Sequence, residues 1–280
     1  MSPWSHKEMQ VLLSPDQVTL LSVQRTLTWR GLRRTMHDPH RVCCNSAIGA
    51  QPWRAAVQAL ETALSESSGG KTTATVILSN HFLRYAMVPW RAELANAEED
   101  LSFARHCFTR VYGKAALQWE IRLNEQPPEM PRLASAVDAE LLDALRGVFN
   151  AAGLTLQSVQ PHLMAAFNSF RGHLRQRSAW FALLEPGNLC LALLHKGHWS
   201  RVRSQRVDST WREELPLILD REVYLADDTA LPHEVYVCHG ESADTVLPAI
   251  DPWQFHPLPL VPAPGVASAQ GENFTMAMEG

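Results

Sequence analysis

The stretch AWFALLEPGNLCLALLHKGHWSRVRSQRV (179–207) decides the expected fold. It holds three runs of strand-forming residues, at 179–185, 189–195 and 198–207, which are separated only by Pro-Gly-Asn and Lys-Gly. Glycine and proline in such short connections are typical of tight turns between antiparallel strands. The stretch therefore predicts a three-stranded antiparallel meander.

A similar meander opens the chain. Strands are expected at 9–14 and 18–25, and the turn sequence Pro15-Asp16-Gln17 joins them. A third run at 27–36 follows so closely that we expect it to extend the same sheet. Two such units in one chain suggest an ancient duplication.

Helices and strands alternate after each meander. Apolar residues at helical spacing indicate the helices, Asp138 is expected to cap one of them, and strand-forming runs indicate the strands. In chain order we expect a helix at 52–66, strands at 73–79 and 82–88, a helix at 93–112, strands at 116–123 and 132–137, a helix at 138–152, a strand at 154–159, helices at 162–174 and 209–226, and a strand at 234–238.

The end of the chain has a different composition. Residues 251–267 contain five prolines and are expected to wrap over the surface. Residues 273–279 are apolar enough that we expect a short terminal helix there.

A chain of 280 residues exceeds the usual size of a single core, which is roughly 100 to 200 residues. We therefore expect an α/β protein with two lobes. The first lobe is predicted at 1–175, with an inserted helix-strand subdomain around 91–125, and the second at 176–280 with a proline-rich C-terminal segment.

Composition narrows the function classes. Hydrophobic residues make up 46% of the chain and the net charge is −4, so the chain has a core and no general basic field for nucleic acid. The opening MSPWSHKEMQ shows no signal peptide and no apolar run is long enough to span a membrane. Five scattered cysteines without a CxxC pair are typical of reduced thiols. We expect a cytoplasmic protein.

Two repeats of three strands, helix, strand, helix, strand and helix resemble the actin-like (ribonuclease-H-like) fold. Three segments carry a narrower resemblance: VILSNHFLRYAMVPW (76–90), AVDAELLDALRGVFNAAGLTLQSVQPHLMAAFNSF (136–170) and NFTMAMEG (273–280). They resemble the actin-like assembly proteins of type IV pili, of the PilM kind, and the cytoplasmic domain of the type II secretion platform protein, of the GspL kind. The resemblance implies two lobes, each a mixed sheet with flanking helices.

The resemblance also implies where a nucleotide would lie. Active actin-like ATPases hold phosphate on two hairpin loops of the Asp-x-Gly type. Here the first loop has no glycine and contains Pro15, which has no N–H donor, and the second contains Pro186. The adenosine position has a single glycine beside Glu241. The vestigial cofactor-binding positions are Ser14, Asp16, Glu185, Gly187 and Gly240.

These losses lead to a functional expectation. We predict no catalytic residue, no metal ligand and no cofactor, and hence a degenerate scaffold rather than an enzyme. By resemblance, its partner is a cytoplasmic segment of an inner-membrane protein in a pilus or type II-like secretion assembly, which would recruit the chain to the inner face of the membrane. The alternative is a nucleotide-binding switch or ATPase in which Asp16 and Glu185 hold magnesium with ATP. A sugar or small-acid kinase of the same fold is a third, weaker reading.

Two residue groups leave their roles open. Among nine tryptophans, we expect Trp90 and Trp211 in the core, and any exposed ones would mark a binding face. The arginine-rich segment 25–41 is either a surface for an anionic partner or a solvated strand face.

Overall fold

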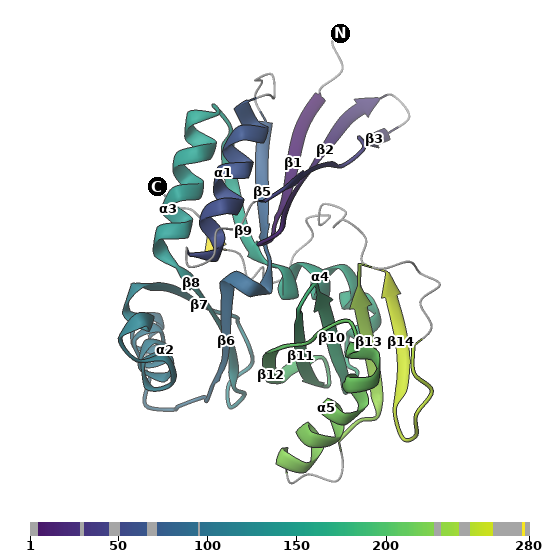
Figure 1. The fold of residues 1–280 in the computed structure, drawn as a ribbon. Coiled ribbons are helices and arrows are strands. Elements are labelled where there is room, and N and C mark those ends of the chain that lie inside the picture. The colour runs from purple at the N-terminus through teal and green to yellow at the C-terminus, as the bar shows by residue number, and fades with distance from the viewer. Residues whose placement is uncertain are drawn as a thin grey trace.

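The computed structural model describes residues 5–28, 31–44, 51–65, 72–94, 96–226, 231–240, 247–259 and 276–277. Within these ranges the strands form three sheets, which have seven, five and three strands (Figure 1). The seven-stranded sheet belongs to what we call the first lobe, the five-stranded sheet to the second lobe, and the three-stranded sheet forms a small subdomain beside both.

The first-lobe sheet has the strand order β15-β9-β5-β1-β2-β3, and β4 also pairs with β2. The strands β1 and β2 form the expected hairpin, whereas β5 lies parallel to β1 on its other side. Two helices, α1 and α3, pack together beside this sheet (Figure 1). The bounds are β1 (Ser5–Leu13), β2 (Gln17–Thr28), β3 (Gly31–Met36), β4 (His40–Cys43), α1 (Pro52–Ser65), β5 (Thr72–Leu78), α3 (Ala139–Ala151), β9 (Thr155–Pro161) and β15 (Met276–Ala277).

The second-lobe sheet has the order β12-β11-β10-β13-β14. Its first three strands are the antiparallel meander expected from residues 179–207, and β13 and β14 continue the sheet in parallel. The bounds are β10 (Ala179–Glu185), β11 (Asn188–His195), β12 (His198–Arg206), α5 (Trp211–Ala226), β13 (Glu234–His239) and β14 (Gln254–Pro259).

The small subdomain has the strand order β6-β8-β7, all antiparallel, with α2 packed against it. The amide N–H of Glu99 donates to Asn96, which caps the N-terminus of α2. The bounds are η1 (Asn80–Phe82), a short 3-10 helix that precedes the subdomain, then β6 (Leu83–Val88), α2 (Ala97–Tyr112), the 3-10 helix η2 (Gly113–Gln118), β7 (Trp119–Leu123) and β8 (Arg132–Asp138).

One apolar core joins the two lobes. The helix α4 (His162–Leu174) lies between them, and its Phe167 contacts Phe181 of β10 and Trp199 of β12 with ring centroids 6.0 and 4.6 Å apart. These residues belong to the same buried cluster as Val11 of β1. The predicted boundary at residues 175 and 176 lies between α4 and β10 and stays a prediction.

Most expected elements are present, but several expectations need correction. The strands expected at 73–79 and 82–88 are present as β5 and β6, but they lie in different sheets because η1 turns the chain between them. Residues 116–118 form part of η2 instead of a strand, and β4, which pairs with β2, is an additional strand that was not expected.

The proline-rich segment also differs from the expected surface wrap. Residues 254–259 form β14, in which Leu258 is buried. Because β14 is an edge strand, its prolines remove no ladder hydrogen bond from the middle of the sheet. Met276 and Ala277, expected in a terminal helix, instead form a strand antiparallel to β9. The rest of 273–279 and residues 260–267 lie outside the described residues.

Tryptophan placement follows the expectation only in part. Trp211 is buried in the second-lobe core, as expected, but Trp90 is exposed. In the described ranges, no helix combines the length and the apolar character that crossing a membrane requires.

Candidate functional site: the cleft between the lobes

A cavity of about 700 Å³ lies between the two lobes. Such a volume is within the range of small-molecule sites. Its wall includes the turn after β1, the start of α4, the turn after β10 and the end of β13. All five positions predicted from the sequence lie in this wall: Ser14, Asp16, Glu185, Gly187 and Gly240.

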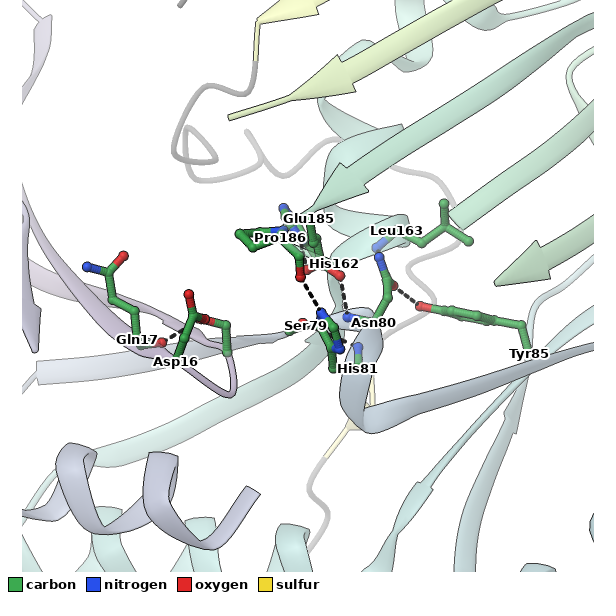
Figure 2. Close-up of polar contacts among 11 residues, drawn as sticks. Asp16, Gln17, Ser79, Asn80, His81, Tyr85, His162, Leu163, Glu185 and Pro186 are labelled. Carbon is green, nitrogen blue, oxygen red and sulfur yellow. Dashed lines mark hydrogen bonds and ion pairs between the residues drawn. The ribbon is translucent and has the colours of Figure 1, made fainter. Parts of the chain in front are cut away.

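The turn after β10 carries Glu185, whose side chain is only 7% exposed. Its Oε1 lies 2.6 Å from Nδ1 of His162, the first residue of α4, and its Oε2 accepts a hydrogen bond from the backbone N–H of Asn80 at 2.9 Å (Figure 2). Both carboxylate oxygens therefore have protein partners. Glu185 ties the second lobe to the two segments where β5 and β9 end.

The pKa of Glu185 reflects this arrangement. Burial raises the pKa, but the hydrogen bond and the charge of His162, followed by the Asn80 N–H and the charge of His81, outweigh burial and hold the pKa below the ordinary value. The carboxylate is therefore stabilised in its ionised form by groups of the protein itself.

Asn80 connects the same contact to the subdomain. Its Oδ1 accepts hydrogen bonds from the Tyr85 hydroxyl at 2.6 Å and from the Leu163 N–H at 3.3 Å (Figure 2). Burial is the main reason that the pKa of Tyr85 lies well above its ordinary value, so this hydroxyl remains a donor. Asn80 therefore joins β6, α4 and the turn after β10 in one hydrogen-bond network.

A second contact joins η1 to the turn after β10. Nε2 of His81 donates to the carbonyl oxygen of Pro186 at 2.9 Å. Pro186 and Gly187 are the two central residues of the turn between Glu185 and Asn188, and Gly187 has φ +77°. Proline followed by a glycine with positive φ is typical of a type II turn. The turn thus places Glu185 and the Pro186 carbonyl against η1.

In the turn after β1, Ser14 bonds within the turn, and the Asp16 carbonyl accepts a hydrogen bond from the N–H of Cys44 at 2.8 Å. The N–H of Ser14 donates to the Gln17 carbonyl at 3.0 Å, and Oγ of Ser14 lies 2.9 Å from Oδ1 of Asp16. Pro15 contributes no N–H. Asp16 faces the cavity from the opposite side to Glu185 (Figure 2).

These two turns lack several of the groups with which a phosphate loop would bind a nucleoside triphosphate and magnesium. A phosphate loop of this fold needs free backbone N–H donors and a carboxylate that reaches hydrated magnesium. Ser14 uses its N–H within the turn, Pro15 and Pro186 have none, and each carboxylate oxygen of Glu185 already has a partner in the protein. Within the described residues, no group of three or more His, Cys, Asp or Glu side chains is arranged to hold a metal.

The cavity wall also carries several charged side chains. Three carboxylates line the cavity, on Asp16, Glu185 and Asp208, and Arg41 is the one Lys or Arg among the described lining residues. Hydrogen bonds from the side chain and backbone of Thr210 lower the pKa of Asp208, which keeps it ionised. The cavity wall therefore combines these carboxylates with Arg41 and the histidines His81, His162 and His239.

The adenosine position is described only in part. Gly240 follows β13 and lines the cavity, beside His239, whose ring lies 5.9 Å from that of Trp211. Glu241, which was expected to disfavour adenosine, lies outside the described residues. Within the arginine-rich segment, Arg41 is exposed at the cavity wall, whereas the side chains of 27–34 are not described.

Sequence reasoning missed the partners of Glu185. The sequence patterns indicate only that His162 begins a helix and that Asn80 and His81 connect two strands. The available signal was the polar triplet Ser79-Asn80-His81 inside the apolar run 76–88, because polar residues that interrupt such a run need hydrogen-bond partners when they are buried.

Comparison with known proteins places this geometry in a fold class. No protein-family model matches the chain, and no curated protein matches it either. Among solved structures, the chain is similar to the cytoplasmic domain of EpsL, an inner-membrane component of the type II secretion system of Vibrio cholerae, with 13% identity, 90% of each chain covered and a TM-score of 0.56.

Two further structures agree. A PilM–PilN type IV pilus biogenesis complex matches with 14% identity over 83% of this chain and 81% of that chain, with a TM-score of 0.54. A protein of Bacteroides thetaiotaomicron with an actin-like ATPase fold and unknown function matches with 12% identity over 85% and 84%, with a TM-score of 0.52. The chain has the actin-like fold, as expected, and its structural resemblance to proteins of the GspL and PilM kinds is confirmed.

Proposed function

We propose that the chain is an actin-like scaffold of the cytoplasm, which binds a cytoplasmic segment of an inner-membrane protein in a pilus or type II-like secretion assembly without turning over nucleotide. The observation that carries the proposal is the use of Glu185. In the second hairpin, its carboxylate bonds His162 and Asn80 across the lobe boundary.

This use of Glu185 supports a structural role for the cleft. A carboxylate that orients hydrated magnesium needs at least one oxygen directed at the ion's water shell. Freeing Glu185 for that role would leave the buried Asn80 N–H and the His162 ring without their partner, at a cost of roughly 1 to 3 kcal/mol for each buried group. The fold therefore favours a cleft held by internal bonds.

The similarity to the EpsL domain and to the PilM–PilN complex supports the type of assembly. The first name refers to an inner-membrane component of a secretion system, and the second to a pilus biogenesis complex of two proteins. The partner and the recruitment to the membrane follow by analogy with these proteins.

A second candidate is a nucleotide-binding switch or ATPase with divergent loops. Its specific support is the cavity of about 700 Å³, which keeps the expected location between the lobes and has Asp16 at its wall. On that reading, Mg-ATP would protect the chain against unfolding, and replacing Asp16 or Glu185 by Ala would remove the protection.

Affinity capture from the organism of origin tests the scaffold function. The tagged chain should enrich one inner-membrane protein with a short cytoplasmic segment over the tag alone, equally with and without millimolar Mg-ATP. Enrichment that depends on ATP would favour the switch, and enrichment of no membrane protein would contradict the scaffold.

A further inference from the structure

An exposed apolar surface lies at the end of α2, on the side of the small subdomain away from the second lobe (Figure 1). Val111 is 68% exposed, Leu117 58% and Tyr112 38%. Together with Arg110 and Lys114, which are also exposed, they form what we call the α2–η2 surface. Three neighbouring large apolar side chains at one helix end indicate a contact site more than scattered exposure does.

The base of this surface is packed. The ring of Tyr112 lies 5.2 Å from that of Trp119 and 6.1 Å from that of Phe108, which is fully buried. These ring contacts restrict Tyr112, so a partner would lose little side-chain entropy when it binds there. Tyr, Trp and Arg are also the residue types that are enriched at energetically important interface positions.

The charged residues in this region of the sequence are all basic. Residues 101–119 contain Arg105, Arg110, Lys114 and a histidine but no Asp or Glu. The flanking acids are already engaged, since Asp100 pairs with Arg132 and Glu120 pairs with Arg122 at 3.2 Å.

The two cations at the surface are available. Arg105 is turned inward and donates to the Trp119 carbonyl at 3.2 Å. Arg110 and Lys114 make no ion pair with any residue in the described ranges. The α2–η2 surface therefore offers two unpaired cations beside three exposed apolar side chains.

We propose that the α2–η2 surface binds an acidic peptide segment of a partner protein, with carboxylates that pair with Arg110 and Lys114 and apolar side chains that cover Val111 and Leu117. The inference rests on the proposed scaffold function and specifies one surface for it. Complementary charge of this kind favours the correct partner and speeds association more than it adds affinity.

An anionic lipid surface would present the same charge, but the observations favour a peptide. Interfacial membrane helices carry a long apolar face, whereas here only Val111 and Leu117 project strongly and Tyr112 packs on Trp119.

Site-specific photo-crosslinking in the organism of origin tests this inference. A benzophenone amino acid replaces Leu117 in the full-length chain, and the crosslinked segments are sequenced by mass spectrometry. The control position is Leu217 on α5, which is similarly exposed. We expect a protein adduct at position 117, from a segment with net negative charge, and none of that segment at 217.

Charge reversal sharpens the test. The double variant Arg110→Glu, Lys114→Glu should reduce the adduct about tenfold and leave the thermal unfolding midpoint unchanged, because both side chains are exposed. The matched control Arg175→Glu, Lys196→Glu reverses two exposed cations elsewhere and should leave the adduct intact.

Several results would overturn the inference: a lipid adduct, an adduct from a neutral or basic segment, an undiminished adduct in the Arg110→Glu, Lys114→Glu variant, or no adduct at 117. If affinity capture still enriches a membrane protein in that case, the scaffold function stands and only this surface assignment fails. If capture also finds no membrane protein, both fail.

Discussion

The two turns that face the cleft occupy corresponding places in the two meanders, yet they satisfy their polar groups differently. In the first, Ser14 bonds Gln17 and Asp16 within the turn itself. In the second, Glu185 bonds His162 and Asn80, which lie 23 and 105 residues away in the chain. The first turn is therefore completed by its own residues and by Cys44 of the same lobe, whereas the second depends on the packing of the lobes against each other.

On the proposed function, the difference explains how a cleft can persist without binding phosphate. A local turn tolerates sequence change at little cost to the rest of the fold. A turn that carries contacts between lobes is constrained by stability, whatever happens to its ligand. The comparison therefore predicts unequal effects of mutations in the two turns.

The largest difference is expected between Glu185→Ala and Asp16→Ala. Removing Glu185 leaves a buried N–H and a buried imidazole unpaired, and should lower the free energy of unfolding by about 3 kcal/mol. Removing Asp16 from its exposed turn should cost at most about 0.5 kcal/mol. Urea unfolding of both variants measures the difference, and equal losses would contradict the comparison.

Asn80→Ala should have the next largest effect, about 2 kcal/mol in urea unfolding. It removes the acceptor of the Tyr85 hydroxyl and the Leu163 N–H and leaves both donors buried. Tyr85→Phe removes only one of these bonds and should cost about 1 kcal/mol. An equal loss in the free energy of unfolding for Tyr85→Phe and Asn80→Ala would contradict this network.

Acidic pH should reduce the stabilisation that Glu185 provides in the turn after β10. Because the folded-state pKa of Glu185 lies below the ordinary value of 4.5, the ionised carboxylate stabilises the fold above that pH, and its contribution is lost as the pH falls through the folded-state pKa. The free energy of unfolding, followed from about pH 6 down to pH 3, should fall more steeply for the wild type than for Glu185→Gln. Parallel curves would assign the acid sensitivity to other carboxyl groups.

The smallest effect concerns the thiols on either side of the cleft. Burial raises the pKa of Cys238 at the second-lobe wall to about 12, whereas Cys43 in β4 is exposed. A maleimide reagent at neutral pH should therefore modify Cys43 within minutes and Cys238 only after unfolding. Peptide mapping of the modified chain provides the measurement, and rapid labelling of Cys238 would show that the cleft opens widely.

Local sequence patterns made much of the fold predictable. The meander at 179–207 and the helix at 162–174 follow from residue type, period and turn chemistry, all of which are local. The strand β14 was missed because prolines usually end strands, and only its place at a sheet edge permits them. The pairing of Met276 with Val159 joins residues more than a hundred positions apart, which no local pattern reveals.

The candidate site was predictable in position but not in its bonds. The five residues selected from the hairpin and glycine patterns all line one cavity. Single residues cannot show which way a carboxylate turns, so the use of Glu185 by His162 and Asn80 needed the three-dimensional arrangement. Pro15 and Pro186 were the informative sequence signals, because a missing N–H is visible in the sequence itself.

The central claim, that internal bonds have replaced ligand contacts in this cleft, is tested most directly by isothermal titration of the intact chain with Mg-ATP, followed by an assay for released phosphate. The account predicts no binding at micromolar concentrations and no steady hydrolysis. Micromolar binding with continuous turnover, abolished by Asp16→Ala, would contradict it.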